Sequence, residues 1–141
     1  MRSKKIHQKI KKYILANYSK INKEDMVLGE GIWNRRCHLN SVQKIKDPSN
    51  SEVVKVWLCV FIDINYNEIN IHFINQLYNK KYQDNTLGWQ YTYCDYYLIK
   101  EVDISEFYAI GELLENTKDS LWNLHSNWFD RNILKLKSNL I

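Results

Sequence analysis

The sequence has few features that interrupt a folded chain or anchor it to a membrane. It has one proline and four glycines in 141 residues, and 45% of its residues are apolar. This composition excludes a disordered chain and predicts a single domain over residues 1–141. A membrane helix needs roughly 18 consecutive apolar residues, whereas residues 53–64 form a shorter run that contains Lys55 and Asp63. With no apolar signal segment at the start, the sequence predicts a cytoplasmic protein without a membrane anchor.

Disulfide, metal and phosphate-binding motifs are also missing. The three cysteines, Cys37, Cys59 and Cys94, are an odd number at wide spacings, which favours a reducing compartment over a disulfide framework. A zinc site from Cys37, His38, Cys59 and His72 would lack the usual close pair of ligands. There is no Gly-rich phosphate loop, CxxC pair or internal repeat. The sequence therefore predicts no metal and no cofactor, and it places Cys59 and Cys94 in the core.

Acidic residues are missing from one end of the chain only. Residues 1–12 hold six lysines and arginines and no acid, so the net charge of +4 leaves the remainder acidic by two charges. A solvated, lysine-rich helix face accounts for this pattern, and nucleic-acid binding is not the predicted function. Binding of nucleic acid through these lysines stays open as a weaker hypothesis, for which affinity should fall with salt.

The spacing of apolar residues predicts an α+β domain. In the first third of the chain we expect a helix over 4–17, a loop over 17–31 and a second helix that Asn34 caps and Asp47-Pro48 stops. Four strands should follow, over 53–64, over 68–77, in a short stretch that ends near Asp84, and over 91–100. Two helices should complete the chain, one from Ser105 and one from Asp119 or Ser120 to Leu136. The strand over 53–64 is too apolar to face solvent and should be central. The expected architecture is a central, meandering antiparallel sheet, with the core over 31–100 and flanking helices over 4–17 and 105–136.

The C-terminal helix is expected to carry a wide apolar surface. Its stripe consists of Trp122, His125, Phe129, Ile133 and Leu136. Core packing explains such a stripe, and a homo-oligomer or protein-partner interface is the alternative.

Three residues in chain order could form an activated cysteine nucleophile. Cys37 is expected in the first turn of the second helix, where unpaired amides, the helix dipole and nearby Arg35 and Arg36 favour a thiolate. His72, on a strand, would serve as its base and then as an acid, and Asp84 would orient the imidazole. The amides of the first turn could also hold an oxyanion.

These residues resemble the transglutaminase-like branch of the papain-like cysteine enzymes. The resemblance covers roughly Gly31 to Leu98 and consists of a cysteine at a helix start, then His72-Phe73, then Tyr82-x-Asp84-Asn85-Thr86. It implies a papain-like core with Cys37 as nucleophile, His72 as base and Asp84 as the partner of His72.

The sequence departs from the family pattern at three places near these residues. Asn85 stands where proline is common, and His38 follows the cysteine where an aromatic residue often does. No glutamine precedes the cysteine, so Asn34 or Trp33 would have to supply a side-chain oxyanion donor. His38 should point about 100° away from Cys37 on the helix, which suits a surface or substrate-contacting residue. Together with Asn85, these residues are the oxyanion and substrate candidates.

Two classes of function follow. The leading hypothesis is an acyl-transfer enzyme that acts on a protein or peptide-like substrate through a thioester at Cys37, with hydrolysis, deamidation and amine transfer left open. The contrasting hypothesis is a small non-catalytic binding or inhibitor protein that uses its aromatic surface or basic N-terminal helix. The abundance of Lys, Asn and Ile suggests an AT-rich bacterial or phage genome.

Overall fold

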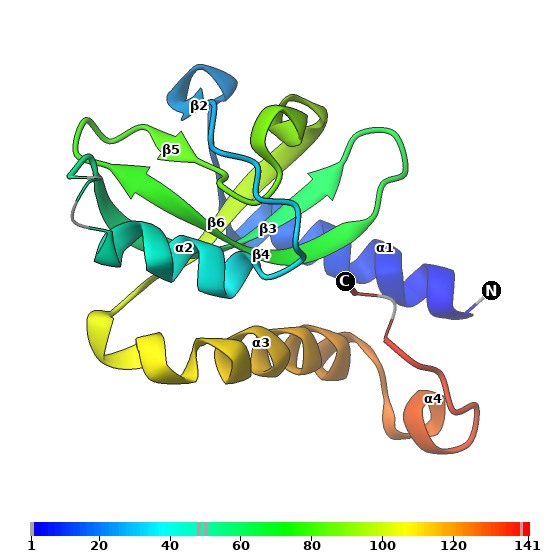
Figure 1. Cartoon of the computed structure of the whole chain (residues 1–141). Coiled ribbons are helices and arrows are strands. Elements are labelled where there is room, and N and C mark those ends of the chain that lie inside the picture. The colour runs from blue at the N-terminus through cyan, green and yellow to red at the C-terminus, as the bar shows by residue number, and fades with distance from the viewer. Residues whose placement is uncertain (1, 48, 50, 139) are drawn as a thin grey trace.

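A six-stranded mixed sheet, curled into a half-barrel, forms the centre of the protein (Figure 1). The computed structural model describes residues 2–47, 49, 51–138 and 140–141. In sheet order the strands are β1 (Ser19–Lys20), β6 (Cys94–Val102), β3 (Val53–Asp63), β4 (Ile69–Leu77), β5 (Tyr82–Gln83) and β2 (Met26–Val27). The predicted α+β class is confirmed, and β3 lies inside the sheet between β6 and β4, as its apolar sequence indicates.

The sheet is not the antiparallel meander that the sequence predicts. The β2 strand pairs with β5 in parallel, and β6 returns to the far side of β3 instead of lying beside β5. Both β1 and β2 come from residues 17–31, which were predicted to be a loop. A two-residue strand is too short to show an alternating pattern, so its pairing depends on neighbours that are distant in the sequence.

The helices lie at both ends of the chain and around the sheet. They are α1 (Arg2–Asn17), α2 (Cys37–Lys46), α3 (Ile110–His125) and α4 (Trp128–Asn132), with 3₁₀ turns η1 (Lys23–Asp25), η2 (Gly88–Tyr93) and η3 (Ile104–Ala109). The predicted first two helices are confirmed; α2 ends at Lys46, and Pro48, the predicted stop, lies outside the described residues. In Figure 1, α2 and α3 run on the same side of the sheet. No helix in the described part of the chain is long and apolar enough to cross a membrane.

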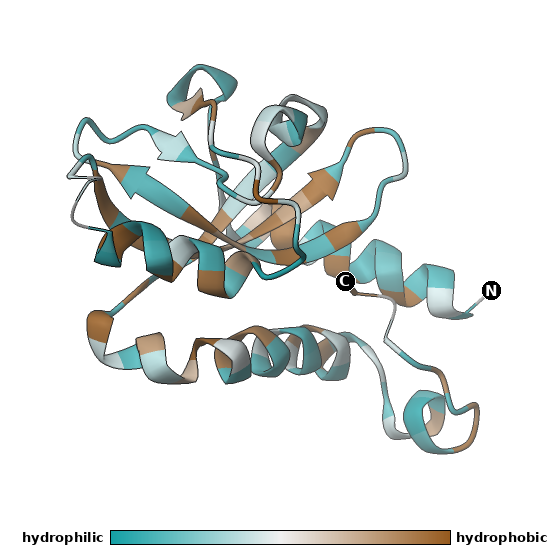
Figure 2. Ribbon diagram, viewed as in Figure 1, coloured by the Kyte–Doolittle hydropathy of each residue, from teal (hydrophilic) through white to brown (hydrophobic). Residues whose placement is uncertain are grey.

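Each face of the sheet has its own apolar cluster. On the helix side, Leu58 and Val60 of β3 and Phe73 of β4 pack with Ile10 of α1 and Trp122 of α3. The opposite cluster consists of Ile21, Met26, Cys59, Phe61, Ile74, Cys94 and Tyr96, and it places Cys59 and Cys94 in the core. Figure 2 shows hydrophobic and hydrophilic stretches alternating along α2 and α3, as expected of helices with one packed face. The β3 and β4 strands are therefore covered on both sides.

The C-terminal helices begin elsewhere than the sequence predicts. Asp119 and Ser120 lie inside α3 and do not begin a new helix. The break comes at Ser126, and Asn127 then caps α4 through a reciprocal capping box with Asp130. The predicted apolar stripe is consequently divided: Trp122 is buried in α3, whereas Phe129 and Ile133 are exposed, the first in α4 and the second just after it. A continuous apolar periodicity overrode the local capping signal at Asp119, since the α3 stripe packs into the core.

Candidate active site

Cys37 is the first residue of α2, at the end of the helix where backbone amides point outward. Asn34 does not cap this helix; its side-chain carbonyl accepts a hydrogen bond from the Arg36 N–H at 3.0 Å, and Arg36 holds the cap position. The predicted cap is therefore wrong, and the predicted place of Cys37 in the first turn is right. First-turn amides have no intrahelical acceptor, and with the helix dipole they stabilise negative charge at this sulfur.

The chain enters α2 in an uncommon backbone conformation. Trp33 has φ of 61° and Arg35 has φ of 59°, both in the left-handed region that side-chain-bearing residues rarely adopt. Strain of this kind persists where the surrounding structure holds it, and it often accompanies functional sites. Here it turns the chain just before Cys37.

His72 and Asp84 form a buried pair beside this helix start. The His72 Nε2–H donates to Asp84 Oδ2 at 2.8 Å, and the two side chains are 6% and 0% exposed. His72 lies on β4, and Asp84 directly follows β5, the strand that pairs with β4. The sheet order thus brings together two residues twelve positions apart.

Asp84 is held by three further donors. Its Oδ2 accepts from the Tyr96 hydroxyl at 2.6 Å, and its Oδ1 accepts from the Thr86 and Leu87 N–H groups at 3.0 and 2.9 Å. Burial alone would raise the pKa of the carboxyl, but the charge and hydrogen bond of His72, with the hydrogen bonds from the Leu87 N–H and the Tyr96 hydroxyl, lower it below its ordinary value. The carboxylate stays ionised and fixed in orientation.

Cys37 and His72 shift each other's pKa. Burial would raise the pKa of the Cys37 thiol, but the charge and hydrogen bond of His72 and the Phe73 N–H lower it overall. For His72, burial acts to lower the pKa, and the charges of Asp84 and Cys37 with their hydrogen bonds raise it to about 10. The thiol loses its proton more readily than usual and the imidazole holds one more tightly, which favours the thiolate–imidazolium form of the pair.

The three cysteines are expected to differ in their reaction with iodoacetamide. Cys37 should be carboxamidomethylated at pH 6–7, below the range where an ordinary thiol ionises, because its pKa is lowered. Burial raises the pKa of Cys59, and burial with Asp63 raises that of Cys94 to about 12, so both should stay unmodified in the folded protein. Peptide mapping by mass spectrometry over pH 5–9 checks this, and equal labelling of all three would contradict it.

A crossing of two loops fixes the position of this helix start. The N–H groups of Gly31 and Ile32 donate to the Asn85 carbonyl at 3.1 and 2.9 Å, and the Trp33 N–H donates to the Thr86 carbonyl at 3.1 Å. Because Asp84 immediately precedes Asn85 and Thr86, the same bonds hold the loop that leads into Cys37 close to the carboxylate of the site.

Glycine is needed where these loops meet. A Cβ on Gly88, which has φ of +57°, would lie 2.7 Å from the Gly31 Cα, and a Cβ on Gly29 would lie 2.2 Å from the Asp84 carbonyl oxygen. Neither distance is possible for a real side chain, so residues 29–31 and 84–88 approach closely only because these positions are glycine.

The predicted oxyanion and substrate residues lie in different places. Trp33 lines the cleft with Cys37. The Asn34 side chain bonds that of Asn40, which in turn donates to Thr86 Oγ1 at 2.9 Å, so Asn34 supports the loop crossing. Asn85 is buried; its side chain accepts from the Glu30 N–H and donates to the Asn75 side chain. Asn85 uses both amide hydrogens on neighbouring side chains, whereas Asn34 uses one on Asn40.

His38 points away from the site, as its helical position predicts. It lies against Gly111 at the start of α3. Its Nδ1 is buried without a hydrogen-bond partner among the described residues, and burial together with Arg36 lowers its pKa. His38 is therefore not placed to contact a group bound at Cys37, whereas the backbone amides of the first turn of α2 are.

Cys37 and His72 open into a cleft of about 720 Å³. Its other walls include Trp33, Leu87 and Leu114, with the cations of Arg35 and Lys118 and the carboxylate of Glu68 at the sides. The cleft thus combines apolar and charged side chains around the sulfur.

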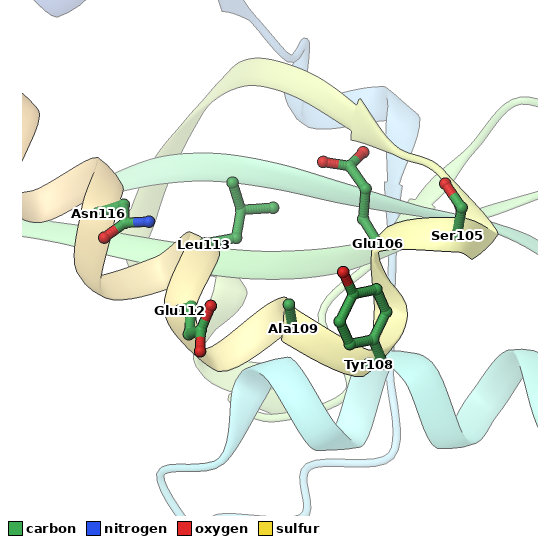
Figure 3. A pocket seen from close by; sticks show the side chains of 7 residues that line it. All are labelled: Ser105, Glu106, Tyr108, Ala109, Glu112, Leu113 and Asn116. Carbon is green, nitrogen blue, oxygen red and sulfur yellow. The ribbon is translucent and has the colours of Figure 1, made fainter.

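A second hollow lies between η3 and α3 and has a different character (Figure 3). Its polar groups include Glu106, whose carboxylate already accepts from Lys100 and from the Asp103 N–H. Its walls contain no cysteine or histidine, so this hollow offers no pair of a thiol and an imidazole.

Sequence reasoning missed two residues of the site, the tyrosine that donates to Asp84 and the isoleucine that lines the cleft near the C-terminal end of the described chain. Tyr96 reaches Asp84 only because β6 lies across the sheet from it, and Ile141 lines the cleft only because the chain returns to β4. Neither residue belongs to a local motif. The glycines at 29, 31 and 88 gave the one available signal, since glycine is rare in this chain.

Neither a metal site nor a comparison with known proteins adds information about the function. In the part of the chain that the structure describes, no group of three or more His, Cys, Asp or Glu side chains has an arrangement that could hold a metal ion. No family model, curated protein or solved structure matches this chain.

Proposed function

We propose that the protein is a cysteine-nucleophile acyl-transfer enzyme with Cys37 as nucleophile, His72 as base and acid, and Asp84 as the residue that orients His72. The observation that carries the proposal is the buried His72–Asp84 hydrogen bond beside Cys37, whose thiol pKa His72 lowers, at a cleft that Cys37 and His72 both line. A buried ion pair of this kind costs desolvation energy, so its place at a cleft favours a chemical role over a purely structural one.

The first step forms a thioester. The Cys37 thiolate attacks the carbonyl carbon of an amide or ester, and the amides of the first turn of α2 are placed to stabilise the oxyanion. The tetrahedral intermediate expels the amine or alcohol, which takes the proton of the His72 imidazolium as the carbon–nitrogen or carbon–oxygen bond breaks. The acyl group is then bonded to sulfur and His72 is neutral.

The second step returns the enzyme to its starting state. Neutral His72 removes a proton from water or an incoming amine, which attacks the thioester carbonyl, and Cys37 leaves as the thiolate. Water gives hydrolysis or deamidation, and an amine gives acyl transfer. Asp84 stays ionised throughout and holds the imidazole in one orientation.

The finer fold assignment is part of the same proposal. It is supported by a helix that begins with the cysteine, a neighbouring strand with the histidine and a following aspartate, which is the order in which the sequence resembles the transglutaminase-like and papain-like enzymes. That likeness supports a protein or peptide-like acyl donor. A non-catalytic binding protein remains the alternative outcome of the experiment below.

An activated ester should acylate the protein at Cys37. With p-nitrophenyl acetate we expect a burst of about one equivalent of nitrophenol per chain, because the low thiol pKa speeds acylation more than it speeds deacylation. Intact-mass spectrometry should show an added acetyl group, and peptide mapping should place it on Cys37.

Two variants make this experiment decisive. Cys37→Ala should lose both the burst and the adduct, whereas Cys94→Ala, which changes a cysteine in the opposite apolar cluster, should keep them. A burst that persists in Cys37→Ala would refute the proposed nucleophile and favour the binding-protein hypothesis.

A further inference from the structure

The last residue of the described chain is bonded to β4 as an extra strand would be. The Ile71 N–H donates to the Ile141 carbonyl at 2.8 Å, and the Ile141 N–H donates to the Ile69 carbonyl at 3.1 Å. These two bonds enclose Asn70 on β4, the pattern of a parallel ladder. Ile141 thus runs beside β4 in the same direction as β4.

This contact lies on the edge of β4 that also faces the nucleophile. Along this edge β5 pairs at Asn75 and Gln76. The Phe73 N–H, two residues after the Ile71 N–H that bonds Ile141, faces the same edge and contributes to lowering the pKa of Cys37. Ile141 and Cys37 line the same cleft. We refer to the stretch from Ile69 to Phe73 as the β4 edge.

The register of the ladder leads directly to the sulfur. In a parallel pair, every second residue of the added strand bonds two groups of the neighbouring strand. An extended chain that continued two residues beyond the position of Ile141 would donate to the Ile71 carbonyl and bring its own carbonyl to the Phe73 N–H. That carbonyl would then lie beside Cys37.

We propose that the β4 edge is the docking strand for an extended polypeptide substrate that binds parallel to β4, and that Leu140 and Ile141 fill its first part as an internal competitor. The inference rests on the proposed function and names the substrate as a peptide in strand conformation. Unpaired strand edges bind such peptides through main-chain hydrogen bonds.

The exposure of the Leu140 and Ile141 side chains is consistent with a segment that a substrate can displace; we refer to these two residues as the strap. Leu140 is 8% exposed and belongs to the helix-side apolar cluster, which anchors the segment, whereas the Ile141 side chain is 51% exposed. Ile141 is therefore held mainly by its two backbone bonds, each a modest net contribution that a longer peptide with the same pattern can replace.

A proline at position 141 tests the strap. Ile141→Pro removes the N–H that bonds Ile69, whereas Ile141→Ala keeps both backbone groups. The probe is an acetylated, amidated, fluorescein-labelled peptide with the sequence of residues 136–141 followed by two alanines. In fluorescence anisotropy we expect about fivefold tighter binding to Ile141→Pro than to the wild-type protein, as for one lost hydrogen bond, and wild-type affinity for Ile141→Ala.

Protection of Cys37 then tests the register. The eight-residue peptide should slow alkylation of Cys37 in Ile141→Pro, and the same peptide with proline at its sixth position should not. A folded Ile141→Pro protein that binds the peptide no better than wild type would overturn the proposal. Binding does not require a reactive thiol, so this failure is distinct from Cys37 reactivity that is unchanged in His72→Ala, which would refute the proposed function.

Hydrogen exchange in the wild-type protein gives a second test that needs no variant. At saturating peptide, exchange of the Phe73 amide should slow, because the peptide carbonyl replaces solvent and the sulfur as its acceptor. Unchanged exchange at Phe73 under these conditions would also overturn the proposal.

Discussion

Replacing His72 with alanine should slow alkylation of Cys37 at pH 6.5 by at least about tenfold, because an ordinary thiol is only a few per cent ionised near neutral pH. The variant loses the charge and hydrogen bond that lower the thiol pKa, while burial, which raises that pKa, remains. The pH profile of alkylation should therefore move to higher pH, beyond the range of an exposed cysteine.

The measurement is the pseudo-first-order rate of iodoacetamide labelling at Cys37, followed by mass spectrometry from pH 5 to 10. His125→Ala is the matched control, since its imidazole bonds the Leu121 carbonyl and packs on Tyr13 at the end of α3. That variant should keep the wild-type profile. If His72→Ala keeps it as well, the thiolate does not depend on an imidazole and the proposed pair is wrong.

Replacing Asp84 with alanine should destabilise the fold by about 3–5 kcal/mol, the range for removing one partner of a buried charge pair. The substitution leaves the His72 Nε2–H and the Tyr96 hydroxyl without their acceptor, together with the Thr86 and Leu87 amides. Buried donors without acceptors pay their full desolvation cost. Urea denaturation followed by tryptophan fluorescence measures the loss.

The pH dependence separates this charge effect from simple loss of packing. Folding lowers the pKa of Asp84, so the stability that its ionised form contributes is present above its ordinary pKa near 4 and is lost as pH falls through the lower folded value. The difference between the wild-type protein and Asp84→Ala should consequently shrink in acid.

Asp95→Ala is the control for this second prediction. Asp95 contacts Lys20 and Lys23 at 3.7 Å with its side chain 30% exposed, and surface pairs of this kind contribute little. It should change stability by less than about 1 kcal/mol. An Asp84→Ala protein as stable as Asp95→Ala would show that the buried carboxylate is not needed to satisfy its donors.

Local patterns in the sequence were enough to predict the helices and strands whose apolar residues recur at a regular spacing. Isoleucines four residues apart predicted α1, and the apolar density of residues 53–64 predicted a strand at the centre of the sheet. Strand alternation also placed His72 on the face of β4 opposite Phe73, which packs toward the helices. Propensity and period act over a few residues, so they can be read without the rest of the chain.

Only the tertiary structure decided the contacts that complete the site. The parallel pairing of β2 with β5, the Tyr96 hydroxyl on Asp84, the approach of Gly88 to Gly31 and the ladder from Ile141 to β4 all join residues distant in the sequence. Such contacts depend on how the elements pack, and packing is a property of the whole chain. The sequence by itself therefore determined which strongly periodic elements form and which three polar residues are candidates for chemistry, whereas the folded sheet decided how those residues are oriented, buried and reached.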